Sequence, residues 1–555
     1  MSDLVRDTQW TRRGVLGALA GGAAAGLLAG CKSPDDVRPP GGKLRLPTAI
    51  PQRRFPGMTP SGNPGVPPAF ERFAAHPFTS VEKKPVPSGK EVSTLQILWG
   101  VPPPSMHSDP WWLDLNKRLG APVNPLLAPD ASFGDKLMTV MASGDLPDLT
   151  YIHTDYAPGI QRAILQGAFT ELSKYLSGDA IKDFPNLAQL PTYSWKNSAV
   201  EGGIYGVPRP IPIVNGRVGL YRRDWAKKLG FDGSPKNADE LLKMFTGFTQ
   251  EKVTGKRSWA MGTIDTAVAQ QMYRVPNGWR LEKSGRLVNA LETEEFVEAL
   301  EFMRKLWKAG AIHPDGPNLS GEQLGDLFKN GQTGYYAQGY IPEFGVSGTR
   351  GVTKEANKGA DPYPFMPPGH DGGDPLMYQG PGYYGYMGIP SKIGEDEKRT
   401  RELLGVLDYF AAPFGSKEYV FMTYGLEGKM FKYDKDGNPV STGDTSTSNW
   451  MALNYMCEPM EMAFYFPGAA SDALLAQKAL QQAVPLSVPN PTLGLVSETA
   501  INRAPALSQL NTDYQNGIIM GNRSINDMGD WRKRWRTTGG DKMRSEYEDS
   551  LARTS

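Results

Sequence analysis

The sequence predicts an α/β protein with at least two lobes, and three observations support this. The chain has 555 residues, far more than the ~250 to 300 residues at which a single hydrophobic core stops growing. A strand, a helix and a second strand follow one another between residues 93 and 152. Helix and strand patterns return between residues 293 and 337. Such alternation is typical of parallel sheets covered by helices.

The first of these units spans residues 93–152. Residues 93–99 are apolar and β-prone, which predicts a strand. Ser132 is expected to cap a helix, with Asp135 completing a capping box and Gly144 ending it. The apolar face of this helix consists of Phe133, Leu137, Val140 and Met141. Residues 147–152 then predict a buried strand.

The second helix and strand lie in the middle of the chain. Thr293 is expected to cap a helix with acidic residues in its first turn and lysines in its last. Residues 333–337 predict a strand. The stretch 340–385 is dense in glycine and proline, so we expect a long loop region there. Asp436-Gly437 predicts a hairpin turn.

The N-terminus carries an export signal. Arg12-Arg13 precedes a run of Gly, Ala and Leu, which is typical of the twin-arginine or Sec type. The run covers 17 residues, short of the ~20 apolar residues of a membrane-spanning helix. It ends in Leu28-Ala29-Gly30-Cys31, which resembles the lipobox of bacterial lipoproteins. We therefore expect residues 1–30 to be a signal peptide and Cys31 to be diacylated, anchoring the protein to the outer face of the cytoplasmic membrane.

Composition limits the remaining possibilities. Residues 32–91 contain thirteen prolines, so we expect 31–91 to be an extended, lipid-anchored linker. The alternative is an ordered coil that wraps the body. Charge is balanced at 60 Lys+Arg against 59 Asp+Glu, which argues against a nucleic-acid partner. With Cys31 acylated, Cys457 has no disulfide partner and is expected in the core.

Motifs for catalysis or cofactor binding are absent from the sequence. It contains no His-Glu-x-x-His, Cys-x-x-Cys, Gly-x-Ser-x-Gly or Walker pattern. The five histidines lack metal-ligand spacing, so we expect neither a metal nor a cofactor. The dinucleotide-like glycines at 380–385 run into a predicted strand rather than a helix, which favours a turn. Paired carboxylates for glycoside hydrolysis have no discriminating power among 59 acids.

Several segments resemble a known family in the order in which that family carries them. These segments are residues 142–149, 203–208, 220–230, 327–334 and 424–428. Together with the lipobox, they resemble the family 1 extracellular solute-binding proteins of ABC importers, especially the larger saccharide-binding lipoproteins of the LplA and alginate-oligosaccharide type. One departure is the basic stretch 249–257, which lacks the alternating acids of the calcium loop in alginate-type members. We expect no bound calcium there.

The resemblance implies a two-lobed periplasmic-binding-protein-like fold of type II, or cluster D, with the ligand in a cleft between lobes joined by hinge strands. The N-terminal lobe would comprise 92–210 plus 388–430, and the C-terminal lobe 211–387 plus 431–545. Hinge crossings are expected at 208–214, at 384–390 and near 425–430.

The implied function is capture of a saccharide, specifically an oligosaccharide, and its delivery to ABC transporter permease subunits by a non-catalytic monomer. Two alternatives are a secreted glycan hydrolase or lyase, and the same fold binding a peptide or a small organic ion. Sugars are bound by aromatic faces and by polar side chains. The candidate ligand-binding residues are Trp99, Trp111, Trp112, His153, Asp155, Arg209, Asn215, Trp279, Tyr340, Tyr383 and Tyr384. Any of these aromatic residues could instead be core, and Arg209 and Asp155 could form a surface pair.

Overall fold

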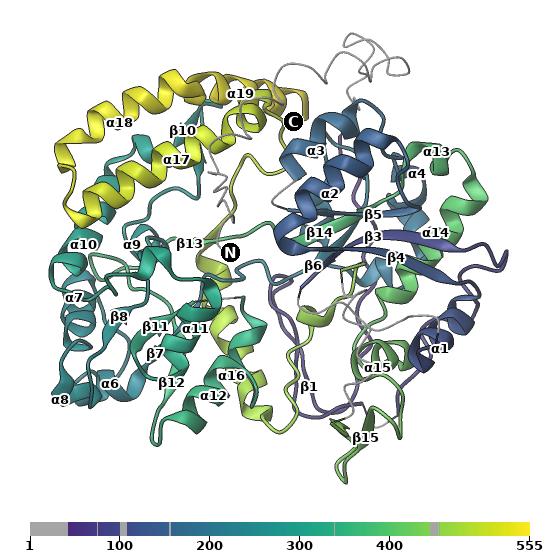
Figure 1. Ribbon diagram of the computed structural model, residues 1–555, viewed down its shortest axis with the longest axis horizontal. Helices are drawn as coiled ribbons and strands as arrows, with labels where there is room; N and C mark the ends of the chain where they lie inside the picture. Colours follow the sequence, from purple (N-terminus) through teal and green to yellow (C-terminus); the bar gives the residue numbers. More distant parts are fainter. Residues whose placement is uncertain are drawn as a thin grey trace, which may run out of the picture.

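A computed structural model describes residues 43–554 apart from 75, 100–107, 155–156, 338, 444–452 and 454. Two lobes lie side by side, each with its own sheet and hydrophobic core (Figure 1). The predicted two-lobed α/β fold is therefore confirmed. Within the described part, no helix combines the length and apolarity needed to cross a bilayer. The export signal, Cys31 and Asp155 lie outside the described residues.

The N-terminal lobe is built on a five-stranded sheet with the order β4-β3-β5-β14-β6. Strand β3 is parallel to both β4 and β5, whereas β14 is antiparallel to β5 and β6. The strands are β3 (Val92–Leu98), β4 (Val123–Pro129), β5 (Leu149–His153), β6 (Val207–Pro210) and β14 (Tyr383–Gly388). The helices of this lobe are α1 (Pro110–Leu119), α2 (Asp130–Ser143), α3 (Ala157–Leu165), α4 (Ser173–Leu176), α5 (Thr192–Ser198), α13 (Ser391–Gly394), α14 (Glu397–Phe410) and α15 (Lys417–Tyr424).

Helix α2 has the expected apolar face but begins differently from the prediction. It starts at Asp130, and the residue before it, Pro129, makes no side-chain cap. The Ser132 hydroxyl donates to the Pro129 carbonyl instead of capping the helix. The predicted capping box is therefore wrong, because strand β4 runs directly into the helix. Gly144 does end the helix, with a φ of 74°.

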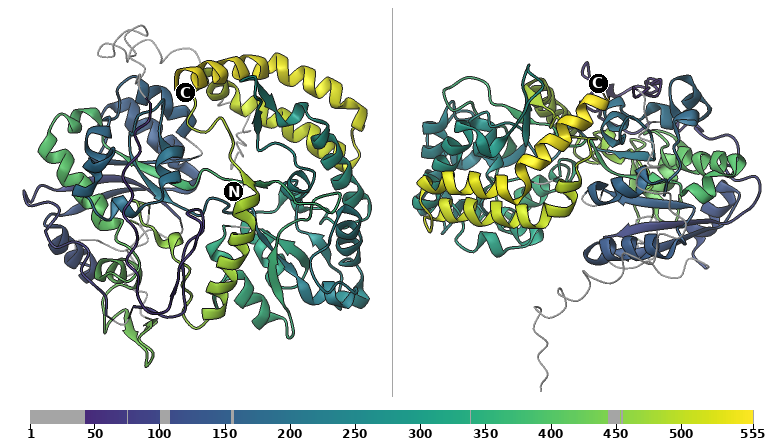
Figure 2. Two further views of the ribbon diagram at one scale, coloured as in Figure 1. Left: turned by 180° about the vertical axis from the view of Figure 1, so that it is seen from behind. Right: turned by 90° about the horizontal axis from the view of Figure 1, so that it is seen from above.

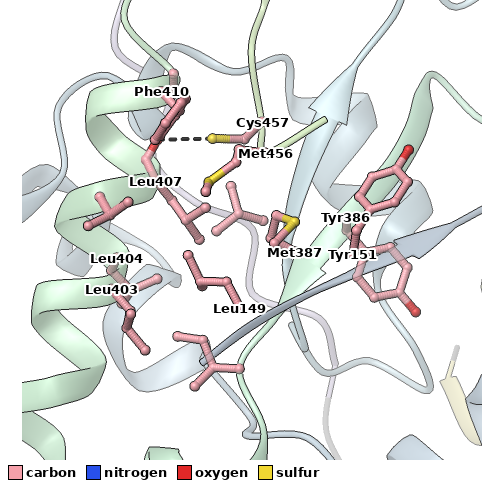
Figure 3. Close-up of a cluster of buried hydrophobic side chains, with 14 of the residues drawn as sticks. Leu149, Tyr151, Tyr386, Met387, Leu403, Leu404, Leu407, Phe410, Met456 and Cys457 are labelled. Carbon is pink, nitrogen blue, oxygen red and sulfur yellow. Dashed lines mark hydrogen bonds between the residues drawn. The ribbon is translucent and has the colours of Figure 1, made fainter. Parts of the chain in front are cut away.

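Helix α14 supplies much of the N-terminal core. Its residues Leu403, Leu404, Leu407 and Phe410 face Leu149 of β5 and Met387 of β14 (Figure 3). Cys457 is fully buried beside them, and its thiol donates to the Leu407 carbonyl at 2.9 Å. The prediction that Cys457 is a core residue is confirmed.

The C-terminal lobe has a four-stranded sheet with the order β12-β7-β11-β8. Strand β7 is antiparallel to β12 and β11, and β11 is parallel to β8. The strands are β7 (Gly219–Arg222), β8 (Trp259–Met261), β11 (Thr333–Tyr336) and β12 (Pro362–Phe365), with a separate hairpin of β9 (Trp279–Leu281) and β10 (Leu287–Asn289). The helices are α6 (Arg223–Lys228), α7 (Ala238–Gly247), α8 (Glu251–Thr254), α9 (Ala267–Met272), α10 (Glu294–Lys308), α11 (Gly321–Lys329) and α12 (Thr349–Ala356).

Local signals in this lobe were partly correct. Thr293 caps α10, because its side chain accepts from the Phe296 amide at 3.3 Å. On the side of the N-terminal lobe, the hairpin turn at Asp436-Gly437 is also confirmed, between β15 (Phe431–Tyr433) and β16 (Pro439–Ser441), which lie beside α15. The expected long loop at 340–385 is wrong, since it contains α12 and β12. Strand β12 lies at the edge of its sheet, where Pro362 and Pro364 are tolerated.

Among the described residues, three chain segments between β6 and α16 cross from one lobe to the other. The first, after β6, runs beside the second, which precedes β14. The Ile211 amide donates to the Gly382 carbonyl at 3.2 Å, and the Gly380 amide donates to the Ile213 carbonyl at 2.7 Å. The third crossing follows Cys457 and leads into α16 (Ala470–Ala483), because Leu453, Met456 and Cys457 still belong to the N-terminal core. The crossings expected at 384–390 and 425–430 lie within the N-terminal lobe.

The C-terminal helices connect the lobes along one side. Helices α17 (Glu498–Met520), α18 (Met528–Trp535) and α19 (Asp541–Thr554) cover the C-terminal lobe and reach α3 (Figures 1 and 2). Arg553 of α19 forms an ion pair with Glu201 at 3.4 Å, and the Ser550 hydroxyl donates to the same carboxylate. Strands β13 (Met377–Tyr378) and β17 (Ser487–Val488) form a separate parallel pair, and β13 lies near the middle of the molecule in Figure 1.

Residues 43–91 form a strap rather than an extended linker. It contains β1 (Met58–Thr59) and β2 (Ala69–Phe70). The Ile50 amide donates to the Ala188 carbonyl in the N-terminal lobe, and Gln477 of α16 donates to the Thr59 carbonyl. Phe70 and Phe73 are buried against Phe414. The linker prediction is wrong for these residues, because apolar side chains between the prolines bury against the body.

Candidate ligand-binding site

Both lobes bring the carboxyl ends of parallel strands toward the crossing segments. In the N-terminal lobe these ends belong to β3 and β5, and in the C-terminal lobe to β8 and β11. Loops after the carboxyl ends of such strands are where open α/β sheets bind ligands. The site is therefore described as an N-terminal half and a C-terminal half.

The N-terminal half is a cluster of His153, Arg209, Tyr384 and Tyr455. The His153 and Tyr384 rings meet edge to face with centroids 4.7 Å apart. The Arg209 guanidinium lies 5.0 Å from the Tyr455 ring centroid and 5.7 Å from that of Tyr384. Tyr384 and Tyr455 are half-buried, whereas His153 and Arg209 are buried. The two tyrosine rings are thus the part of this cluster that a ligand can touch.

A close backbone approach holds Tyr384 in place. The Tyr151 hydroxyl donates to the Tyr384 carbonyl at 2.8 Å. A Cβ on the next residue, Gly385, would lie 2.4 Å from the Tyr151 hydroxyl, and the φ of Gly385 is 155°. Only glycine fits there. At this position β14 pairs regularly with β5, but its pairing with β6 is irregular between Tyr383 and Tyr386.

Arg209 is already neutralised within the protein. Its Nη1 atom lies 3.3 Å from Oε1 of Glu461, which belongs to the third crossing. Burial opposes the charged form, but Glu461 together with the nearby Tyr151, Tyr455 and Glu458 outweighs it, and the pKa of Arg209 is raised. This ion pair links β6 to the third crossing, so Arg209 has a structural partner whether or not a ligand is present.

The C-terminal half is a pocket of about 340 Å³ at the carboxyl ends of β8 and β11. It is lined by Gly216, Arg217, Met261, Gly262, Thr263, Ile264, Asp265, Ala267, Leu324, Tyr335, Tyr336 and Ala337. Residues 216–217 come directly after the first crossing, so the pocket adjoins the hinge. Among the described residues, no group of three or more His, Cys, Asp or Glu side chains could hold a metal ion.

Asp265 is the carboxylate of this pocket. It is half-buried, and its Oδ1 atom accepts from the Ala267 amide at 3.1 Å. The Tyr335 hydroxyl donates to its Oδ2 atom over a longer distance of 3.4 Å. Burial raises the pKa of Asp265, although the Ala267 amide and the nearby Arg217 oppose this. Asp265 is thus held in position with lone pairs left for ligand hydroxyl groups.

Arg217 is the cation of the pocket. Its guanidinium lies 5.9 Å from the Tyr378 ring centroid, in the second crossing. Its Nε atom is buried and has no hydrogen-bond partner among the described residues. Arg217 therefore differs sharply from Arg209, which has Glu461.

A larger hollow of about 530 Å³ lies elsewhere in the C-terminal lobe. It is bounded by the edge strand β12, the proline-rich segment 364–375 and α16. It does not lie at the carboxyl ends of parallel strands. Size alone does not favour it, because position relative to the strand ends and crossings is what the fold dictates for a ligand.

Four of the sequence-predicted residues belong to the site as described. Trp99 follows β3 and is 40% exposed, which is unusual for so large an apolar side chain. Tyr384 and Arg209 lie together in the N-terminal half. The buried His153 ring packs edge to face against the Tyr384 ring in the same half.

Other predicted residues lie in the interior instead. Trp111 and Trp112 are fully buried in α1, where Trp111 stacks on Phe421 with centroids 5.3 Å apart and donates to its carbonyl. Trp279 is buried against Trp535 and Tyr547. Because their faces are covered by protein, these tryptophans cannot stack on a ligand in this conformation.

Tyr340, Tyr383 and Asn215 also have structural partners. The Tyr340 hydroxyl donates to the Ala476 carbonyl at 2.8 Å, and its amide donates to Oδ1 of Asn215. Tyr383 is buried beside Tyr386. These three residues therefore stabilise the region around the crossings rather than the ligand contact itself.

The residues that sequence reasoning missed are Arg217, Asp265 and Tyr335 in the pocket and Tyr455 in the N-terminal half. Arg217 follows the first crossing and Asp265 lies four residues beyond the end of β8, which is the signal that could have found them, whereas Tyr335 lies within β11. Strand β8 was not recognised, however, because it has only three residues. Without β8, Asp265 has no visible strand to follow.

The chain belongs to the bacterial extracellular solute-binding protein family, whose model matches residues 115–407. This confirms the resemblance seen in the sequence and defines an exported protein that binds a solute rather than an enzyme.

Two relatives come from Bacillus subtilis (strain 168). Lipoprotein LipO is 26% identical over 81% of this chain and 90% of its own length. The polygalacturonan/rhamnogalacturonan-binding protein YtcQ is 23% identical over 85% of this chain and 94% of its own.

Solved structures share the fold. An ABC-transporter-associated solute-binding protein for HMO from Bifidobacterium longum infantis superposes with a TM-score of 0.62 at 14% identity, covering 83% of this chain and 98% of that one. The alginate-binding protein AlgQ2 gives a TM-score of 0.59 at 15% identity, covering 83% and 97%.

Proposed function

We propose that this protein captures an oligosaccharide outside the cytoplasm and delivers it to the permease subunits of an ABC transporter. The names of YtcQ and AlgQ2 describe saccharide-binding proteins, and that of the Bifidobacterium protein places it with an ABC transporter. The proposal extends this role to the present chain on the basis of its own site.

The observation that carries the proposal is the pocket beside the hinge, with Asp265 fixed at its wall. A carboxylate with free lone pairs accepts sugar hydroxyl groups. Trp99 and Tyr384 add aromatic surface, which suits the apolar C–H face of a sugar ring. Aromatic faces on one lobe and a polar pocket on the other are what a ligand enclosed by hinge closure would require.

The same proposal includes export and anchoring. Arg12-Arg13 favours twin-arginine export, and Cys31 would carry a diacyl anchor at the outer face of the cytoplasmic membrane. Two acyl chains give stable membrane attachment where one does not. Lys43, where the described strap begins, lies twelve residues after Cys31. A monomeric body would therefore stand within about 40 Å of the lipid, whereas a sixty-residue linker would permit a much larger separation.

Calorimetric titration tests the binding function. The purified protein is titrated with a panel of oligosaccharides and, separately, with a panel of peptides. We expect saturable binding to a saccharide, a higher melting temperature in its presence and a smaller radius of gyration. Binding to peptides alone would refute the proposal.

Anchoring has its own test. A Cys31→Ser variant, expressed in a host with lipoprotein processing, should appear in the soluble fraction while the unchanged protein stays with the membrane. Membrane retention of the variant would refute the anchor.

A further inference from the structure

Arg217 lines the pocket but makes no ion pair with any described residue. Its Nε atom is buried without a hydrogen-bond acceptor among the described residues, and its guanidinium lies 5.9 Å from the centroid of the Tyr378 ring. An arginine keeps its charge at any physiological pH, so it cannot resolve a missing partner by losing a proton. A partly buried guanidinium of this kind requires an acceptor from outside the protein.

The carboxylates near Arg217 do not supply that acceptor. Asp265 is close enough to influence Arg217 electrostatically but lies beyond ion-pair distance, and its own oxygens accept from the Ala267 amide and the Tyr335 hydroxyl. Glu343 is fully buried and does not line the pocket. The pocket thus contains two separate groups: the fixed carboxylate of Asp265, and the guanidinium of Arg217, which makes no hydrogen bond with a described residue.

We infer that Arg217 recognises a carboxylate on the ligand, so that the transported molecule is an acidic saccharide containing a uronic acid. The inference rests on the proposed saccharide function. A guanidinium binds a carboxylate through two parallel hydrogen bonds, and this geometry discriminates it from a neutral hydroxyl. Asp265 would accept hydroxyl groups of the same sugar, with its negative charge keeping the ligand carboxylate on the Arg217 side.

The other arginine of the site is not available for this role. Arg209 is paired with Glu461 at 3.3 Å and is buried beneath the Tyr384 and Tyr455 rings. A ligand carboxylate would have to displace Glu461 from it. Recognition of the acid is therefore assigned to the C-terminal half of the site.

The experiment compares matched ligands that differ only in charge. Oligomers of galacturonate and of alginate are used both as free acids and as their methyl esters, which keep the sugar backbone but remove the carboxylate. Each is titrated calorimetrically into the purified protein and into the variants Arg217→Gln, Arg217→Lys and Arg280→Gln. Arg280 is an exposed arginine of the same lobe outside the pocket, so its variant controls for the loss of one positive charge.

For the unchanged protein and Arg280→Gln, we expect a free acid to bind about 10- to 100-fold more tightly than its ester. Arg217→Gln should bind the two forms equally, and Arg217→Lys should fall between them because it keeps the charge without the planar fork. The melting temperature without ligand should not fall in Arg217→Gln, since Arg217 has no hydrogen-bonding or ionic partner to lose.

Several results would overturn the inference. Equal affinity of the unchanged protein for acids and esters would do so, as would tighter binding of neutral or sulfated oligosaccharides than of any uronate. Retained preference for the acid in Arg217→Gln would assign recognition to another residue. Binding of peptides with no binding of any saccharide would instead overturn the proposed function, and the inference with it.

Discussion

The two halves of the site contain the same charged residue in opposite surroundings. Arg209 of the N-terminal half is buried, ion-paired with Glu461 and covered by two tyrosine rings. Arg217 of the C-terminal half faces a pocket and has no described acceptor for its Nε atom. One arginine connects elements of the protein, and the other is left for a ligand. Residue type alone therefore does not identify a binding residue; the state of its partners does.

The aromatic residues divide in the same way. Trp99 of the N-terminal lobe is 40% exposed beside the site, whereas Trp279 of the C-terminal lobe is 6% exposed and packed on Trp535 and Tyr547. Stacking surface thus comes from the N-terminal lobe, while the C-terminal lobe contributes a polar pocket. Substitutions of these two tryptophans test this division.

Trp279→Ala should have the largest effect, and on stability alone. Removing a buried tryptophan costs about 3–5 kcal/mol of unfolding free energy. The affinity of the folded fraction for its saccharide should not change, because Trp279 does not line the pocket. Chemical denaturation gives the stability, and calorimetry at a temperature where the variant is folded gives the affinity.

Trp99→Ala is the matched variant for this comparison. It should leave stability nearly unchanged and weaken binding by about 1–2 kcal/mol, the loss of one aromatic stacking surface. If Trp279→Ala weakens binding while Trp99→Ala does not, the assignment of stacking surface to the N-terminal lobe is wrong.

Arg209→Gln should be destabilising where Arg217→Gln is not. The substitution leaves Glu461 without its partner in a largely buried position, which costs about 2–4 kcal/mol of unfolding free energy. A double variant, Arg209→Gln with Glu461→Gln, should recover part of that loss, because Glu461 then carries no unpaired charge, while the buried Glu458 still lacks the favourable charge of Arg209. Urea denaturation of the three variants measures the difference. An equal loss of stability in Arg217→Gln would mean that Arg217 is not free.

The sequence predicted the N-terminal half of the molecule better than the C-terminal half. Strands β3 and β5 and the apolar face of α2 are long, continuous patterns, and Trp99 and His153 follow directly from the strand ends. Prediction from local sequence patterns succeeded here because the central parallel strands of this lobe are close together in the chain. What it missed there were strand β4, the start of α2, and helix α1, which contains Trp111 and Trp112.

The C-terminal half could not be predicted in the same way, for physical reasons. Its pocket gathers residues near 217, 265 and 335, and only the tertiary fold brings these together. Strand β8 is short, and the prolines of edge strand β12 obscure its pattern. The partner of Arg209, Glu461, lies on a crossing segment whose position the sequence did not reveal. Whether an arginine is paired is a property of distant contacts, which periodicity does not report.

Asp408 tests how a buried charged group affects stability. Unlike Arg217, it is an acid that can lose its charge by taking up a proton. Burial in the N-terminal core raises its pKa to about 7, although the Asn186 and Leu187 amides donate to it. The folded state then holds a proton that the unfolded state releases near its ordinary pKa of about 3.9. The contribution of this group to stability therefore falls as the pH rises from about 4 to about 7.

Asp408→Asn should remove that decline. At pH 8 the variant should be more stable than the unchanged protein by about 2 kcal/mol, because it avoids a buried charge while its amide oxygen still accepts from the two backbone amides. At pH 4 the two proteins should differ little. Thermal denaturation across this pH range measures the effect; a variant that is less stable at pH 8 would show that the carboxylate is stabilising when charged.

Tyr193→Phe should have the smallest effect, and it examines what the two halves share. Tyr193 of α5 donates to the Ile211 carbonyl of the first crossing at 3.0 Å, and its hydroxyl lies 3.7 Å from the Met462 sulfur of the third. Its ring lies against Gly382 of the second crossing, where φ is 73° and a Cβ would be 2.5 Å away. One N-terminal side chain thus contacts all three crossings.

Losing the Tyr193 hydroxyl in Tyr193→Phe removes a single hydrogen bond, which lowers the unfolding free energy by about 1 kcal/mol. Because the ring still separates the crossings, closure on ligand should persist, with affinity changed less than about threefold. Scattering with and without ligand measures closure, and Tyr433→Phe, on the β15 hairpin, is the control. A variant that binds ligand but no longer becomes compact would show that this hydrogen bond, rather than the ring, couples the two halves.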